Sequence, residues 1–246
     1  MKACFQPPDT IPAGATTAKA SFSSYSLFLP YFLPYAAYVV IANLPFGLPK
    51  EYNYTLRLLV VPAILAWGWA WYLPLCRNNR TSASVLSGIV YGSVGVPLWV
   101  LLCKPFAPSD APIWDMWGFL FRLAAACTIV PIAEEYLFRG YVLRLASLWD
   151  AQRKLQPKNA FQSVLFERSI NEIEQLKWSL PAVAISGVAF TLGHQVWEWP
   201  AAMVYGTMMC VLAIKQQSLI ACVVAHAITN LGLGAYVFFM DQWQYW

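Results

Sequence analysis

Charged residues are scarce in this sequence. They make up 11% of its 246 residues, whereas hydrophobic residues make up 59%. Soluble domains contain about 25% charged residues, so this composition excludes a single water-soluble globular unit. The net charge of +4 is small and spread along the chain, which argues against a nucleic-acid-binding surface.

Cysteine patterns that mark disulfide frameworks or thiolate zinc sites are also missing. The six cysteines form no CxxC pair, and most lie in apolar runs, where a free cysteine behaves as a small hydrophobic residue. Residues 1–25 are rich in Pro, Ser, Thr and Ala and lack the continuous apolar stretch of a signal peptide. We therefore expect residues 1–25 to form a flexible N-terminal tail.

Long apolar runs occupy most of the remaining sequence. A membrane-spanning helix needs about 20 mostly apolar residues. This measure predicts an all-α fold, a polytopic membrane helix bundle of about seven transmembrane helices, with residues 26–246 as a single integral membrane domain. The sixth run is short, which leaves six or eight spans as alternatives. The predicted spans lie near residues 26–46, 57–75, 84–103, 122–145, 180–197, 201–214 and 217–239.

One polar segment, residues 150–178, interrupts the apolar runs. Apolar residues recur within it at roughly helical spacing from Phe161 to Leu176, which predicts an amphipathic helix on the membrane surface. With seven spans, most Lys and Arg residues outside the spans fall on the side of the N-terminus. The positive-inside bias then places the N-terminus in the cytoplasm.

Several ionisable residues lie inside three of the apolar runs. Ionisable side chains are costly in hydrocarbon, so a set of them there calls for a functional explanation. The ionisable residues of the fourth and seventh runs fall near the centres of their spans. The ionisable residue of the fifth run lies about 9 Å from the centre of its span, at a rise of 1.5 Å per residue. The set consists of Glu134, Glu135, Arg139, His194 and His226.

Spacing along each predicted helix indicates which of these groups are paired. Glu135 and Arg139 are four residues apart with the acid first, which favours an ion pair on one helix face. Glu134 points about 100° away and has no local partner, which suits it to be a general base. His226 and Asn230 are also four residues apart, so both side chains can point at one site.

This arrangement suits the hydrolysis of a peptide bond. Glu134 with His194 can deprotonate a bound water, while His226 and Asn230 can donate hydrogen bonds to the oxyanion that forms. Two histidines and a glutamate also make a common catalytic zinc set, although the contiguous HExxH helix is absent. The sequence favours a reaction without a cofactor and leaves zinc as the alternative.

Three motifs resemble those of the CAAX protease and bacteriocin-processing family, also called the Abi family. They are EEYLFRG at 134–140, FTLGH at 190–194 and HAITN at 226–230. The resemblance covers a catalytic core over residues 120–240 and implies an α-helical intramembrane endopeptidase that cleaves near the C-terminus of its substrate. It implies that Glu134 activates water with His194, and that His226 and Asn230 form the oxyanion hole. The remaining motif residues, which would support the site, are Glu135, Arg139 and Phe190.

The C-terminal run from Ile220 to Trp246 also resembles CAAX-protease-related proteins that accompany exosortase and PEP-CTERM sorting systems. This second resemblance implies a bacterial inner membrane and a link to an exosortase system. The expected partners are a peptide or protein substrate and the lipid bilayer, with no nucleic acid. A non-catalytic immunity or scaffold protein of the same fold is the alternative, and the absence of an internal repeat weighs against a transporter.

Overall fold

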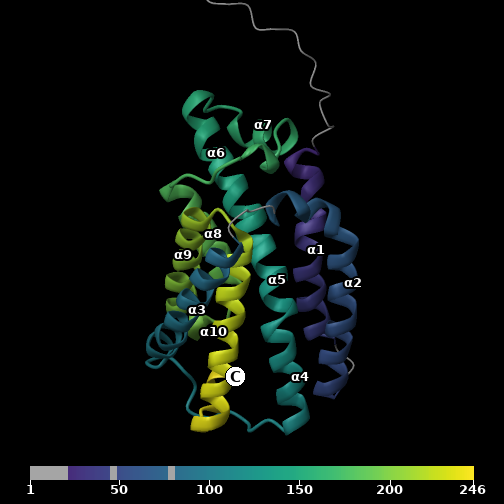
Figure 1. Ribbon diagram of the computed structural model, residues 1–246, viewed down its shortest axis with the longest axis vertical. Coiled ribbons are helices and arrows are strands. Elements are labelled where there is room, and N and C mark those ends of the chain that lie inside the picture. The colour runs from purple at the N-terminus through teal and green to yellow at the C-terminus, as the bar shows by residue number, and fades with distance from the viewer. Residues whose placement is uncertain (1–21, 45–48, 77–80) are drawn as a thin grey trace, which may run out of the picture.

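The computed structural model describes residues 22–44, 49–76 and 81–246, and in these ranges it contains helices and no β-strand (Figure 1). The long helices run along one axis, and a smaller group that includes α7 lies across one end. The helices are α1 (Ser24–Ala42), α2 (Lys50–Cys76), α3 (Thr81–Cys103), α4 (Met116–Cys127), α5 (Ile129–Glu135), the π-helix η1 (Tyr136–Val142), α6 (Leu143–Leu155), α7 (Ala160–Phe166), η2 (Ile170–Glu172), α8 (Leu180–Leu192), η3 (Val196–Glu198), α9 (Trp199–Gln216), α10 (Leu219–Met240) and η4 (Trp243–Tyr245).

Apolar helices long enough to cross a membrane confirm the predicted polytopic bundle. Among the described residues there are five such segments, and α8 is a shorter apolar helix. Together with α9, these segments pass through the bundle in alternating directions (Figure 1). The chain is therefore an integral membrane protein, while a count of seven spans, which includes α8 and α9, stays a prediction.

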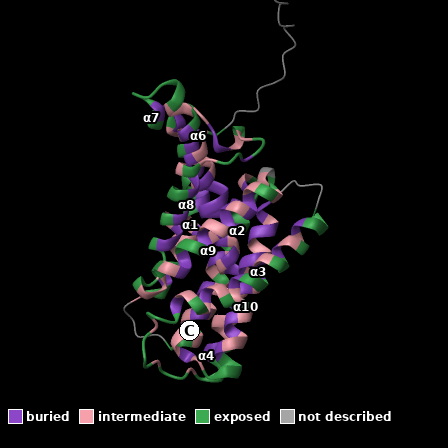
Figure 2. Cartoon of the chain, turned by 90° about the vertical axis from the view of Figure 1, so that its left-hand side faces the viewer, coloured by how far each residue is buried: buried purple, intermediate pink, exposed green. Residues whose placement is uncertain are grey.

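The outer faces of the bundle are apolar as well. Buried residues line the interior, and exposed residues cover the outside and the ends (Figure 2). Large exposed side chains on the long helices include Leu59, Leu86 and Leu101. An outward apolar surface of this kind fits contact with lipid rather than with water.

The first helix includes the last two residues of the predicted N-terminal tail, 1–25. The helix α1 begins at Ser24, and the Ser23 hydroxyl caps it by accepting a hydrogen bond of 3.3 Å from the Ser26 amide. The last two residues of the predicted tail are therefore helical. The part of the prediction that concerns residues 1–21 lies outside the described residues.

The fourth predicted span, 122–145, is not one regular helix. It is broken at Thr128, whose backbone angles of φ −121° and ψ −77° are not helical. Pro131 explains the break, because it lacks an N–H and its ring clashes with the carbonyl four residues earlier, at Cys127, where α4 ends. Beyond Glu135 the chain continues as the π-helix η1, a form that recurs at functional sites.

A row of glycines brings α3 and α10 into close contact. Gly88, Gly92 and Gly95 face α10, and a Cβ atom added at Gly92 would lie 2.5 Å from the Ala225 carbonyl oxygen. The Thr229 hydroxyl donates to the Gly92 carbonyl at 3.0 Å. Small residues permit this approach, which fixes the position of the helix that carries His226 and Asn230.

The polar segment 150–178, here called the cap, does not contain the predicted amphipathic helix over 161–176. Its residues form the short helix α7 and the 3-10 turn η2 instead. The Arg144 side chain donates to the carbonyls of Ile170 and Ile173. The Gln217 side chain accepts from the Leu176 amide at 2.7 Å and donates to its carbonyl at 2.8 Å. These side chains bind backbone N–H and C=O groups of the cap that would be hydrogen-bonded to one another in a continuous helix. The same bonds connect the cap to the bundle.

Candidate active site

A buried set of three charged or polar side chains lies at the junction of α5, η1 and α10. Arg139 Nη1 lies 3.1 Å from Glu135 Oε1, and His226 Nδ1 lies 2.8 Å from the same oxygen. A second guanidinium nitrogen of Arg139 donates to the Gly206 carbonyl of α9 at 3.0 Å. Glu135 and Arg139 have no exposed surface, so the predicted ion pair is present in a fully buried form.

Phe190 of α8 is the apolar centre of the site. The Arg139 guanidinium stacks over its ring at 4.5 Å from the ring centre, as a cation–π contact. The ring centres of His194 and His226 lie 4.6 Å and 6.1 Å from that of Phe190. One aromatic side chain therefore brings both histidines and the arginine together.

The fifth predicted span, 180–197, is not helical as far as His194. The helix α8 ends at Leu192, and Gly193 is its C-cap, so His194 is the first residue beyond the helix. Its Nδ1 atom lies 2.9 Å from the Phe190 carbonyl oxygen, and its ring lies 5.3 Å from that of Trp99 of α3. The turn at the end of α8 thus places the His194 ring against that of Phe190.

Glu134 differs sharply from its neighbour Glu135. Its Oε2 atom is buried and has no hydrogen-bond partner among the described residues. It lies within electrostatic range of His226, Glu135 and Arg139, which belong to the buried set, and of Glu198 at the start of α9. Glu135 Oε2 is also buried without a partner, but Glu135 Oε1 is bound by Arg139 and His226. Glu134 is therefore the carboxylate of the two that these side chains do not bind, and it remains available for chemistry.

His226 and Asn230 lie one helical turn apart on α10, and each makes a hydrogen bond to a different partner. His226 Nδ1 faces Glu135, as described above. The Asn230 amide donates to the carbonyl of Ala126 at 2.7 Å. Ala126 lies in the last turn of α4, where helix carbonyls lack intrahelical donors. The groups left for a substrate are His226 Nε2 and the second N–H of Asn230.

Two further residues, Tyr205 and Tyr35, belong to the site and were not among the residues predicted from the sequence. The Tyr205 hydroxyl donates to Thr229 Oγ1 at 3.0 Å, and its ring lies 5.9 Å from that of His226. Tyr35 of α1 lies within electrostatic range of Glu134. Its hydroxyl oxygen would be 2.5 Å from a Cβ atom added at Gly193, next to His194. Only their positions in three dimensions reveal these residues, because none has a marked spacing to the motifs.

Zinc, the alternative cofactor, would need three or more ligand side chains around one point. The described residues contain no group of three or more His, Cys, Asp or Glu side chains placed to hold a metal. We therefore derive no catalytic step through a metal.

One of three comparisons with known proteins found a match to this chain. A search of curated proteins and a search of solved structures each found no significant match to the chain. A protein-family model, described as type II CAAX prenyl endopeptidase Rce1-like, matches residues 116–232. This range runs from the start of α4 into α10 and contains all the predicted site residues. The segment 116–232 thus belongs to the Rce1-like family of CAAX endopeptidases.

Proposed function

We propose that this protein is an intramembrane endopeptidase that hydrolyses a peptide bond near the C-terminus of a peptide or membrane-anchored protein. One observation carries the proposal. Glu134 has a buried carboxylate oxygen without a partner, beside a buried ion pair, inside the segment that matches a family of CAAX endopeptidases. Catalysis by a glutamate and two histidines is the reaction that uses this arrangement most fully.

In the first step Glu134 acts as the general base. A water molecule held between Glu134 and His194 gives its proton to the glutamate carboxylate, and its oxygen bonds to the scissile carbonyl carbon. The carbonyl π electrons move to oxygen and form an oxyanion. Asn230 donates its second amide N–H to this oxyanion, and His226 donates Nε2–H when both of its ring nitrogens carry protons.

In the second step the tetrahedral intermediate collapses. The oxyanion reforms the carbonyl, the C–N bond breaks, and Glu134 returns its proton to the departing amine nitrogen. The products are a carboxylic acid and an amine, and Glu134 is again ionised. Proton transfer and electron pairs balance without any cofactor.

Glu135 and Arg139 have a positioning role in this scheme. Glu135 Oε1 accepts from both His226 Nδ1 and Arg139, so it fixes the rotation of the His226 ring and directs Nε2 away from the ion pair. Arg139 in turn is held by Gly206 and by the Phe190 ring. The oxyanion donor His226 therefore depends on Glu135 and Arg139 for its orientation.

The test is Glu134→Gln, assayed on a fluorogenic peptide with an isoprenylated CAAX end and on cellular membrane proteins whose C-termini are compared by mass spectrometry. We expect kcat to fall at least about 100-fold, the contribution of a general base, with folded protein retained in the membrane. Glu174→Gln, an exposed change in the cap, is the matched control. Normal cleavage by Glu134→Gln would contradict the catalytic role of Glu134, whereas a lack of cleavage by the wild-type protein would favour the non-catalytic immunity or scaffold alternative.

Chelation separates the glutamate mechanism from the zinc alternative. We expect purified protein to keep its activity after prolonged treatment with EDTA and 1,10-phenanthroline, because the proposed steps need no metal. A complete loss of activity that zinc restores would favour the metal mechanism instead. The link to an exosortase system remains a prediction from the sequence, which co-purification with an exosortase substrate would test.

A further inference from the structure

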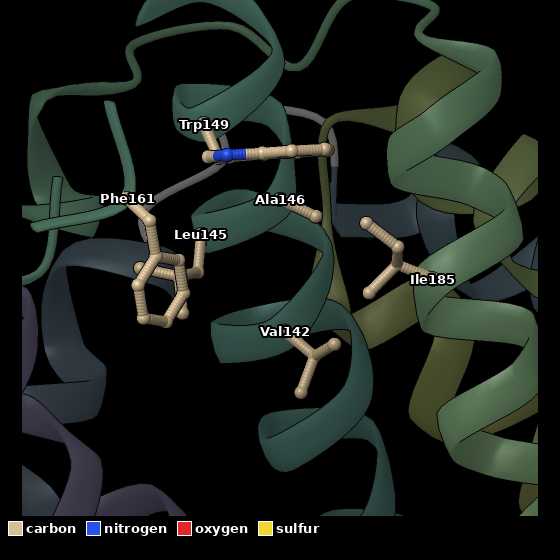
Figure 3. Close-up of a pocket in the computed structure, with 6 residues that line it drawn as sticks. All are labelled: Val142, Leu145, Ala146, Trp149, Phe161 and Ile185. Carbon is tan, nitrogen blue, oxygen red and sulfur yellow. The ribbon is translucent and has the colours of Figure 1, made fainter. Parts of the chain in front are cut away.

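An apolar cavity of about 370 Å³ lies where α6, α7 and α8 meet (Figure 3). Trp149 lies across one end of it, Phe161 and Ile185 face it from opposite sides, and Val142 lies at the other end. Ligand pockets have volumes of about 300–1,000 Å³, so this cavity is large enough for a specific occupant. Its lining consists of Val142, Leu145, Ala146, Trp149, Phe161 and Ile185.

The position of the cavity along α6 matches a membrane–water boundary. The apolar segment from Met116 to Leu155 is 40 residues long, and its midpoint falls at Glu135. Half of a hydrocarbon core of about 30 Å corresponds to about 10 helical residues, which places the boundary near Leu145. The lining residues of η1 and α6, from Val142 to Trp149, lie on both sides of that level.

Basic side chains lie just beyond the polar end of the cavity. The Arg153 guanidinium stacks over the Trp149 ring at 4.9 Å. Arg153 and Lys154 are ion-paired with Asp150 at 2.7 Å and 2.9 Å, and their side chains remain 41% and 67% exposed. Two cations share one anion, so this rim carries a net positive charge and has N–H donors to spare.

We propose that the cavity binds one acyl chain of an anionic phospholipid, with the lipid phosphate held by Arg153 and Lys154. An apolar slot at the depth of the acyl chains, with a basic rim at the depth of the headgroups, matches both halves of such a molecule. The site is separate from the catalytic residues. It lies between α6 and α8. A lipid bound there would contact both α8, which carries Phe190, and α6, which follows the π-helix of Arg139.

The experiment compares variants that fill the cavity with a variant that does not. Ile185→Trp and Ala146→Trp place an indole in the cavity, whereas Leu192→Trp adds one on the exposed face of α8 outside it. Each full-length protein is purified in mild detergent, and retained phospholipid is quantified by native mass spectrometry. We expect the two filling variants to lose the retained lipid and Leu192→Trp to keep it.

The headgroup half of the proposal has its own readout. The protein is placed in nanodiscs of phosphatidylglycerol or phosphatidylcholine with brominated acyl chains, which should quench the fluorescence of Trp149. The Trp149 signal is the difference between the fluorescence of the wild-type protein and that of Trp149→Phe. We expect stronger quenching with the anionic lipid, and Arg153→Gln should reduce that preference about fivefold, the effect of one basic residue near a membrane surface.

Three outcomes would overturn the proposal. Equal lipid retention by the filling variants and by Leu192→Trp would show that the cavity holds no lipid. A raised KM for the isoprenylated peptide with lipid retention unchanged would assign the cavity to the substrate. Loss of a dimer in the filling variants, again with unchanged lipid, would assign it to a second copy of the chain. Lipid retention and fluorescence quenching do not depend on cleavage, so the lipid site and the proposed protease activity are tested separately.

Discussion

At the scale of single residues, two consecutive glutamates have opposite surroundings. Each has a buried Oε2 atom without a partner among the described residues, but Glu135 is bound through Oε1 by Arg139 and His226, which do not bind Glu134. The difference follows from the helix, because consecutive side chains point about 100° apart and cannot share a partner easily. The same substitution at the two positions should therefore have different consequences.

We expect Glu135→Gln to destabilise the protein by about 3–5 kcal/mol, because it leaves the guanidinium of Arg139 buried without a counter-charge. The measurement is unfolding by denaturant in detergent micelles. Glu134→Gln is the matched control, and it should lose much less stability because it breaks no ion pair. Equal losses in the two variants would contradict the assignment of Glu135 to support and Glu134 to catalysis.

We expect Tyr35→Phe to lower kcat about tenfold while KM and stability stay close to wild type. The Tyr35 hydroxyl lies against Gly193, beside His194, and within electrostatic range of Glu134, where an O–H donor can orient the attacking water. The loss corresponds to one hydrogen bond to a charged group. Tyr25→Phe, at the exposed start of α1, is the control. A fall in stability as large as the fall in activity would indicate a packing role for Tyr35.

At the scale of elements, the contact between α3 and α10 sets the position of half the site. We expect Gly92→Leu to destabilise the protein by about 1–3 kcal/mol and to reduce cleavage, because its side chain would meet the Ala225 backbone, next to His226. Ser93→Leu makes the same change on the exposed face of α3 and should be tolerated. Thermal unfolding and kcat, measured on both variants, test this. Unchanged values for Gly92→Leu would mean that α3 and α10 can separate freely.

Apolar runs predicted the long helices well, because each must cover a length of hydrocarbon with apolar side chains. Spacing predicted the Glu135–Arg139 pair, which depends only on one helix. The bond from His226 to Glu135 could not be predicted, because it joins α10 to α5 across the bundle. The early end of α8 before His194 and the irregular cap were missed for the same reason. In the cap, Arg144 and Gln217 bind backbone groups from distant parts of the chain.

At the scale of the whole molecule, the cap marks one end of the bundle. The start of α1 lies at that end, since the Ser24 amide donates to the Arg168 carbonyl of the cap at 2.8 Å. The loop between α9 and α10 lies there too, through the bonds of Gln217 to Leu176. The opposite end holds the loop between α3 and α4 and the end of α10 (Figure 1). Basic side chains at the cap end include Arg144, Arg153, Lys154, Arg168, Lys177 and Lys215.

This distribution of charge leads us to predict that the cap faces the cytoplasm. The test introduces single cysteines into a cysteine-free background, at Lys177 in the cap and at Asp110 in the exposed loop before α4, and labels cells with a membrane-impermeant maleimide. Asp110→Cys should react in intact cells, whereas Lys177→Cys should react only after the membrane is permeabilised. The reverse pattern would place the cap outside the cell. Labelling of both positions from one side would mean that the segment from α4 to α6 does not cross the membrane. A cytoplasmic cap would also place the basic rim of the cavity in the leaflet whose anionic lipids attract such side chains.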